Sequence, residues 1–166
     1  MVSQTNEQAL EAAIEKSLAG ISSEELKAGA QISCHGAGYK VGYSADFNMQ
    51  YALDERFFWE FLEKTQKEEL EKLKKNNPKD WKPKLQERFD RLIKKHGLLH
   101  LLKKGLSVDD AHFHLMYPAP LASSSEKVQQ NFEDNIFSCT RQIRYSQANP
   151  LQEIDMVIFI NGIPLI

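Results

Sequence analysis

Asp155 is the residue whose type and position most directly suggest chemistry. It comes just before the apolar run Met156–Ile160, and the pair Asn161-Gly162 separates this run from a second one that starts at Ile163. An Asn-Gly pair between two apolar runs predicts a β-hairpin with a type I′ turn, because both central residues must take positive φ. We therefore expect Asp155 on a strand that leads into a tight hairpin.

The hairpin determines which residues face each other across the turn. A two-residue turn places Ile160 opposite Ile163 and Val157 opposite Ile166, so the partner of Asp155 would be the second position beyond the last residue given. A carboxylate at such a place can bind a hard cation such as Mg²⁺, which prefers several oxygen ligands. Without partners, the same carboxylate would protect a strand edge or cap a turn.

A second candidate carboxylate, Glu11, lies in a helix predicted over residues 7–18. One stripe of that helix is apolar and the next is acidic: Leu10, Ala13, Ile14 and Leu18, then Glu7, Glu11 and Glu15. We expect the apolar stripe to pack against the sheet, which leaves Glu11 at its border, on the same side as Asp155. The alternative is that Glu11 belongs to a solvent-facing stripe, since spacing fits both.

Positive charge is concentrated in residues 64–104. This segment contains fourteen Lys and Arg against six Asp and Glu, whereas the rest of the chain has seven against seventeen, and the net charge is -2. Such segregation predicts either a basic face for a polyanion such as DNA or a solvated helical face. The lysines that we expect to contact DNA are Lys74, Lys75, Lys94 and Lys95.

Two arginines, Arg141 and Arg144, precede Asp155 on a strand predicted over residues 137–145. Both are candidate contacts for DNA phosphates. Because neighbouring side chains alternate between the faces of a strand, the two should not both point into one cleft. At least one of them is therefore expected to be structural.

Length and composition indicate one soluble globular domain over residues 1–166, with 42% hydrophobic and 27% charged residues. Cys34 and Cys139 are too few for a disulfide framework, and no apolar run is long enough for a membrane span or resembles a secretory signal. The expected compartment is the cytoplasm, without membrane partners. No P-loop motif occurs, so we expect no ATP binding by these residues.

The remaining pattern predicts the elements that position these side chains. Helices are expected at residues 54–76, at 80–96 or 82–96, and at 125–135, and strands at 111–117, 137–145 and 153–160. An extended segment is expected at 41–51, a short apolar turn at 98–104, and a loop or irregular insertion at 20–37. This order predicts an α/β or α+β fold, with a mixed sheet flanked by helices and a helical basic insertion at residues 54–104.

Several separated blocks of the sequence resemble one known family. The blocks are Leu10-Glu11-x-x-Ile14, Gly38-Tyr39-x-x-Gly42 with Asp46-Phe47, Tyr51-Ala52-Leu53-Asp54, Phe61-Leu62-x-x-Thr65-Gln66, Thr140-Arg141-Gln142 with Tyr145-Ser146, and Asp155-x-Val157-x-Phe159-x-Asn161-Gly162-x-Pro164. In this order they resemble the N-terminal region of the restriction (R) subunit of type I restriction-modification enzymes, over nearly the whole chain.

The resemblance implies a PD-(D/E)xK nuclease core, in which an Asp and a following acidic-x-Lys motif hold Mg²⁺ and activate water against a DNA phosphodiester. Asp155 matches that Asp, as catalytic residue and metal ligand, and Glu11 matches a Glu that the family carries on its first helix. The acidic-x-Lys motif should follow Pro164, but the sequence given stops at Ile166. We therefore expect residues 1–166 alone not to cleave DNA.

For the whole protein, the resemblance implies an ATP-driven DNA translocase after this region, so that ATP would act only there. It also implies a complex with modification and specificity subunits that cleaves unmodified double-stranded DNA. The alternative that the sequence leaves open is a non-catalytic module for DNA binding or subunit assembly, or the remnant of an interrupted gene.

Overall fold

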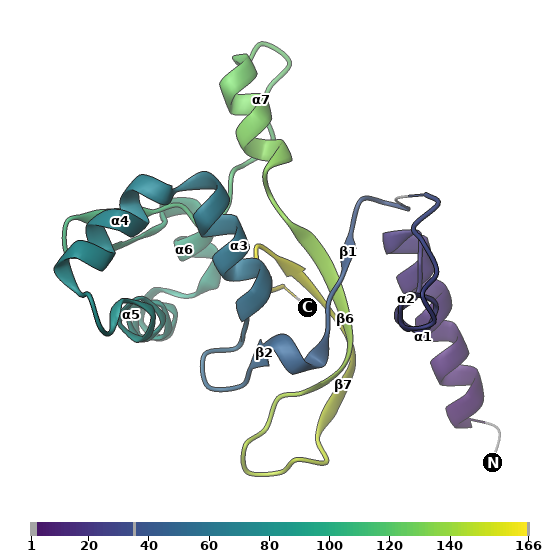
Figure 1. Ribbon diagram of the computed structural model, residues 1–166. Coiled ribbons are helices and arrows are strands. Elements are labelled where there is room, and N and C mark those ends of the chain that lie inside the picture. Colours follow the sequence, from purple (N-terminus) through teal and green to yellow (C-terminus); the bar gives the residue numbers. More distant parts are fainter. Residues whose placement is uncertain (1–2, 35, 166) are drawn as a thin grey trace. The chain divides into compact units, whose positions relative to one another are not determined.

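The computed structural model describes the backbone of residues 3–34 and 36–165, and the chain forms two compact units (Figure 1). The first unit comprises residues 1–56 and 136–166, and the second unit comprises residues 57–135. The predicted mixed fold class is confirmed, because helices accompany a sheet that has both parallel and antiparallel pairs. The helical insertion expected at residues 54–104 falls largely in the second unit, which continues to Asn135.

The helices and strands are distributed between the two units as follows. The first unit contains α1 (Ser3–Ala19), α2 (Ser23–Lys27), β1 (Lys40–Val41), the short 3-10 helix η1 (Ser44–Asp46), β2 (Phe47–Asn48), β3 (Leu53–Asp54), β6 (Phe137–Arg144), β7 (Glu153–Ile160) and β8 (Ile163–Pro164). Helix α3 (Glu55–Thr65) leads into the second unit, which contains α4 (Lys67–Asn76), α5 (Trp81–His96), α6 (Leu98–Lys104), β4 (Leu106–Val108), β5 (Ala111–Phe113) and α7 (Glu126–Glu133).

The main sheet of the first unit has the strand order β1-β6-β7-β8. β1 pairs in parallel with β6, whereas β6 with β7 and β7 with β8 are antiparallel. The two long strands, β6 and β7, run beside each other in Figure 1. Glycine is required at Gly42, just after β1, because a Cβ there would collide with the hydroxyl of Thr140 on β6.

The predicted hairpin between β7 and β8 is confirmed. Asn161 and Gly162 take φ values of 51° and 76°, as a type I′ turn requires. Ile160 lies opposite Ile163, which is the predicted register. The next expected pair involves Ile166, which lies outside the described residues.

The helix predicted over residues 54–76 is divided in the structure. α3 and α4 are separated at Gln66, which is buried. Its side-chain Nε2 donates to the carbonyl of His114 at 2.8 Å, and its Oε1 accepts from the His114 N–H at 2.6 Å. The amide thereby pairs with backbone groups just after β5. Helical spacing gives no signal of this break, because the partner is 48 residues away in the sequence.

The other predicted elements differ mainly in length. The ranges predicted for α1, α5, α7, β6 and β7 agree with the structure to within a few residues, and the short apolar turn expected at residues 98–104 is the helix α6. The segment 20–37, expected to be irregular, contains α2, which begins with a capping box formed by Ser22 and Glu25. The strand predicted over residues 111–117 ends at Phe113.

Each unit buries its own apolar side chains. In the first unit, Ile143, Val157 and Phe159 form a cluster against which Phe47 packs. In the second unit, the most deeply buried aromatic residues are Phe57, Phe58, Phe61, Phe89 and Phe113. The aromatic cluster that begins α3 is therefore core, as its helical spacing predicts. Among the described residues, no helix has the length and apolar character needed to cross a bilayer.

We expect Asn161→Ala to lower the free energy of unfolding by about 2–3 kcal/mol, because Asn161 Oδ1 is the acceptor for the buried Ile136 N–H at 2.6 Å. Urea unfolding measures this change. Asn149→Ala is the control, since its exposed side chain accepts only from a loop N–H at 3.1 Å, and its effect should stay within about 0.5 kcal/mol. Equal effects of the two substitutions would contradict a structural role for Asn161.

Candidate functional site

Asp155 is exposed on β7, at a point where the ladder with β6 is interrupted. Paired residues flank the interruption on both sides, Arg141 with Met156 and Ile143 with Ile154. Asp155 therefore lies opposite Gln142, whose φ is 56°. Non-glycine residues rarely adopt this conformation, which costs about 1–3 kcal/mol.

Gln142 is a feature of the site that sequence reasoning missed. Glutamine gives no sequence signal for positive φ, unlike the asparagine of the hairpin turn. Backbone outliers of this kind persist only where the surrounding structure holds them, and they gather at functional positions. Here the strand pairs on either side hold Gln142, directly across from the predicted catalytic Asp155.

Arg141, on β6, is buried among three carboxylates of the first unit. Its Nε donates to Glu11 at 3.1 Å, and its Nη1 donates to Glu24 at 2.7 Å and to Glu15 at 3.4 Å. Its Nη2 donates to the Gln8 carbonyl at 3.3 Å. Because the side chain is only 7% exposed, it has little surface left for a phosphate. Arg141 links α1 and α2 to β6, and its guanidinium is not exposed as the predicted contact with DNA would require.

Arg141 and Glu24 stabilise each other's charge. Burial acts to lower the pKa of Arg141, but hydrogen bonds to Glu24 and Glu11 outweigh burial and raise that pKa. Burial acts to raise the pKa of Glu24, but its own backbone N–H and Arg141 outweigh burial and lower it. Acidic groups remain in excess, and Glu15 Oε1 is buried without a hydrogen-bond partner among the described residues.

The predicted orientation of α1 is wrong. Leu10 and Ile14 are 62% and 42% exposed, whereas Glu15 is fully buried. The physical reason is Arg141, because an unpaired buried charge costs more than the burial of two aliphatic side chains gains. No hydrogen bond or ion pair joins Glu11 to Asp155 among the described residues, and the catalytic role of Glu11 stays a prediction.

The remaining predicted DNA contacts lie on the surface. Arg144 is 66% exposed and lies 3.6 Å from an acidic residue of β7. Lys94 pairs at 2.7 Å with an acid one helical turn earlier, and Lys74 lies over a tryptophan ring, 4.8 Å from its centroid. Lys75 and Lys95 are exposed and have no such partner within the described part of the chain.

The described residues alone do not fit a Mg²⁺ site. Among residues 3–34 and 36–165, no group of three His, Cys, Asp or Glu side chains could hold a metal ion. Asp155 offers one carboxylate and Glu11 is engaged by Arg141, whereas Mg²⁺ needs several oxygen ligands. Burial and then Glu15 raise the pKa of the Cys139 thiol to about 11, which disfavours the reactive thiolate.

One family model matches the chain, that of the type I restriction enzyme R protein N terminus, over residues 4–166. The chain belongs to this family. No curated protein and no solved structure matches it. The match confirms the resemblance carried by the separated sequence blocks, and it makes this chain the N-terminal region of a restriction subunit. Type I restriction enzymes are complexes that act on DNA, so the chain is part of an endonuclease system of restriction and modification.

We expect Arg141→Met to destabilise the protein by about 3–5 kcal/mol at neutral pH, because three carboxylates lose their common partner. The lowered pKa of Glu24 provides stability that is present above its unfolded pKa and is lost as pH falls through the folded one. The difference between variant and parent should therefore shrink below about pH 4.

Urea unfolding at several pH values tests this expectation. Arg144→Met removes the same charge from an exposed position on the same strand, and its effect should stay within about 0.5 kcal/mol. A destabilisation by Arg141→Met that is small, or that does not change with pH, would contradict the role given to the Arg141 cluster.

Proposed function

We propose that this region contributes the DNA-cleaving site of its type I restriction enzyme, with Asp155 as a catalytic acid. The observation that supports this most directly is the setting of Asp155 on β7, six residues before the confirmed Asn161-Gly162 turn of the family block. Asp155 is exposed, and no described residue pairs with it, so its carboxylate is open to a ligand.

In this proposal Asp155 is one ligand of a Mg²⁺ ion. The other protein groups belong to the acidic-x-Lys motif that the family resemblance implies after Pro164. The strained backbone of Gln142 supports the proposal, because it restricts the strand opposite Asp155 at the cost of stability. ATP enters only through the translocase that the resemblance implies elsewhere in the subunit.

We expect Asp155→Asn to lower cleavage of unmodified DNA by at least about 100-fold in the R subunit assembled with its modification and specificity subunits, because a metal ligand contributes several kcal/mol to the transition state. Duplex binding and ATP hydrolysis should not change. Residues 1–166 alone should show no Mg²⁺-dependent cleavage.

Glu153→Gln is the matched control, since it removes a charge from an exposed position two residues earlier on β7. It should leave the cleavage rate within about twofold of the parent, as surface substitutions usually do. Undiminished cleavage by the Asp155→Asn complex would remove Asp155 from the site. Robust Mg²⁺-dependent cutting by residues 1–166 would contradict the proposal that the other metal ligands belong to the acidic-x-Lys motif.

The basic segment provides a second part of the proposed function, weak binding of duplex DNA without sequence preference. We expect replacement of Lys74, Lys75, Lys94 and Lys95 by Glu to weaken duplex binding and to flatten its salt dependence, because fewer counterions are released. Fluorescence anisotropy of a labelled duplex over a series of salt concentrations measures both effects. Unchanged binding would mean that these lysines form a solvated face or contact another subunit.

A non-catalytic role in DNA binding or subunit assembly is the second candidate. One observation favours it: fourteen of the twenty-one Lys and Arg lie at residues 64–104, in the second unit, whereas Asp155 belongs to the first. Cleavage that survives Asp155→Asn, together with DNA binding that fails in the lysine variant, would select this role.

A further inference from the structure

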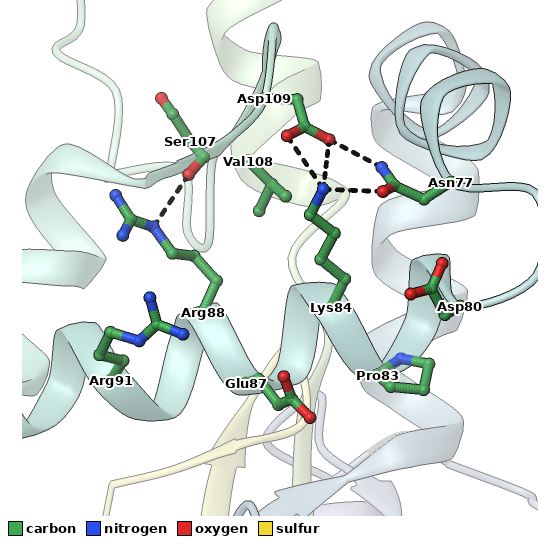
Figure 2. Close-up of a pocket in the computed structure, with 10 residues that line it drawn as sticks. All are labelled: Asn77, Asp80, Pro83, Lys84, Glu87, Arg88, Arg91, Ser107, Val108 and Asp109. Atoms are coloured by element: carbon green, nitrogen blue, oxygen red, sulfur yellow. Dashed lines mark hydrogen bonds and ion pairs between the residues drawn. The ribbon is translucent and has the colours of Figure 1, made fainter.

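The geometry points to a phosphate-binding groove in the second unit, between α5 and the β4–β5 turn, with Arg88 and Arg91 as its anion contacts. The groove encloses a volume of about 580 Å³ and is open to solvent. One wall is the α5 helix and the other is β4 with Asp109 (Figure 2). This inference rests on the proposed function only in taking the phosphate to be part of DNA.

Spacing along α5 brings the cations of the groove onto one face. Lys84, Arg88 and Arg91 follow each other at intervals of four and three residues, and exposed Lys95 continues the same row. In Figure 2 the side chains of Arg88 and Arg91 lie next to each other on the α5 wall. Their positions are about 4.5 Å apart along the helix axis, close enough for both to reach one phosphate group.

The nearest acid is already neutralised. Lys84 Nζ lies 2.9 and 3.0 Å from the two Asp109 oxygens, and Asn77 donates to Asp109 at 2.7 Å. The hydrogen bonds from Asn77 and then from Lys84 lower the pKa of Asp109. Lys84 is therefore paired with Asp109 in the groove wall and is not an anion contact. Because Asp109 already has Lys84 and Asn77 as partners, it competes little with an anion for the two arginines.

The two arginines keep their donors for a ligand. Arg88 Nε donates to the Ser107 carbonyl at 3.3 Å, which orients the guanidinium and leaves its terminal nitrogens available. Arg91 has no hydrogen-bond or ion-pair partner among the described residues. A guanidinium presents paired N–H groups that match two phosphate oxygens, so two adjacent arginines favour phosphate over a single carboxylate.

Neither of the two other acids that line the groove, Asp80 and Glu87, forms an ion pair with these arginines among the described residues. The Glu87 carboxylate points away from both guanidinium groups in Figure 2. Asp80 precedes α5, so it lies about 16 Å from Arg91 along the helix axis. The end of the groove at Arg88 and Arg91 is therefore cationic, although the lining as a whole contains equal numbers of acids and bases.

The test compares Arg88→Gln/Arg91→Gln with Lys27→Gln/Lys127→Gln in the 166-residue chain. The control removes the same charge from two exposed lysines outside residues 64–104. Anisotropy of a labelled 20-base-pair duplex is measured without Mg²⁺ over a series of salt concentrations. We expect the arginine variant to bind at least about tenfold more weakly, with a salt slope reduced by about 2, and the control to change by less than threefold.

Two further measurements separate the loss of an anion contact from misfolding, and DNA from free phosphate. The single variant Arg91→Gln changes an exposed side chain that has no hydrogen bond or ion pair among the described residues, so it tests the anion contact without removing a structural one of that kind. Titration with inorganic phosphate, followed by the arginine Nε–Hε signals in NMR spectra, separates the sources of the phosphate. A signal shift for Arg88 with DNA binding equal to the control assigns the groove to a small free phosphate, whereas weakened DNA binding assigns it to the DNA backbone.

No shift with phosphate, combined with arginine variants that bind duplex as well as the control, would overturn the groove. These outcomes do not depend on cleavage, since Asp155 is intact and Mg²⁺ is absent in every arm. Loss of cleavage in Asp155→Asn with normal binding would leave the groove standing. Failure of the groove would likewise leave the assignment of Asp155 untouched.

Discussion

The first unit depends on the burial of one guanidinium, that of Arg141. A positive charge in the interior is tolerated only with close partners, and Glu11, Glu15 and Glu24 supply them from two helices. This requirement sets the rotation of α1, because residues four apart on a helix share one face. The apolar side chains Leu10 and Ile14 are turned outward as a consequence.

Strand β6 carries a second energetically unfavourable feature, the positive φ of Gln142, directly beside the buried Arg141. Gln142 follows Arg141 and takes positive φ, and it lies opposite the exposed Asp155. The burial of charged groups and the positive φ of Gln142 both carry an energetic cost. Both features lie on the stretch of β6 that runs beside Asp155, so this stretch carries an energetic cost that contacts elsewhere in the first unit must offset.

Sequence alone predicts those features that depend on local chemistry. The Asn161-Gly162 turn was predictable because positive φ at two successive residues has a strong residue signal, and the register of Ile160 with Ile163 follows from it. The rotation of α1 was not, because a hydrophobic stripe carries no information about a buried arginine 130 residues away. The break at Gln66 is of the same kind, since its cause is a backbone segment distant in sequence.

The sequence blocks that carry the family resemblance contain two kinds of residue: those with a structural contact, and Asp155, which has none among the described residues. Gly42 permits close approach to Thr140, Gln66 pairs with the backbone after β5, and buried Asn161 forms the hairpin turn. The contacts of these residues explain their presence by the needs of the fold alone. Asp155 is different, since it is exposed and no described contact explains it. The chemistry proposed for this chain therefore depends on this one carboxylate and not on the length of the match.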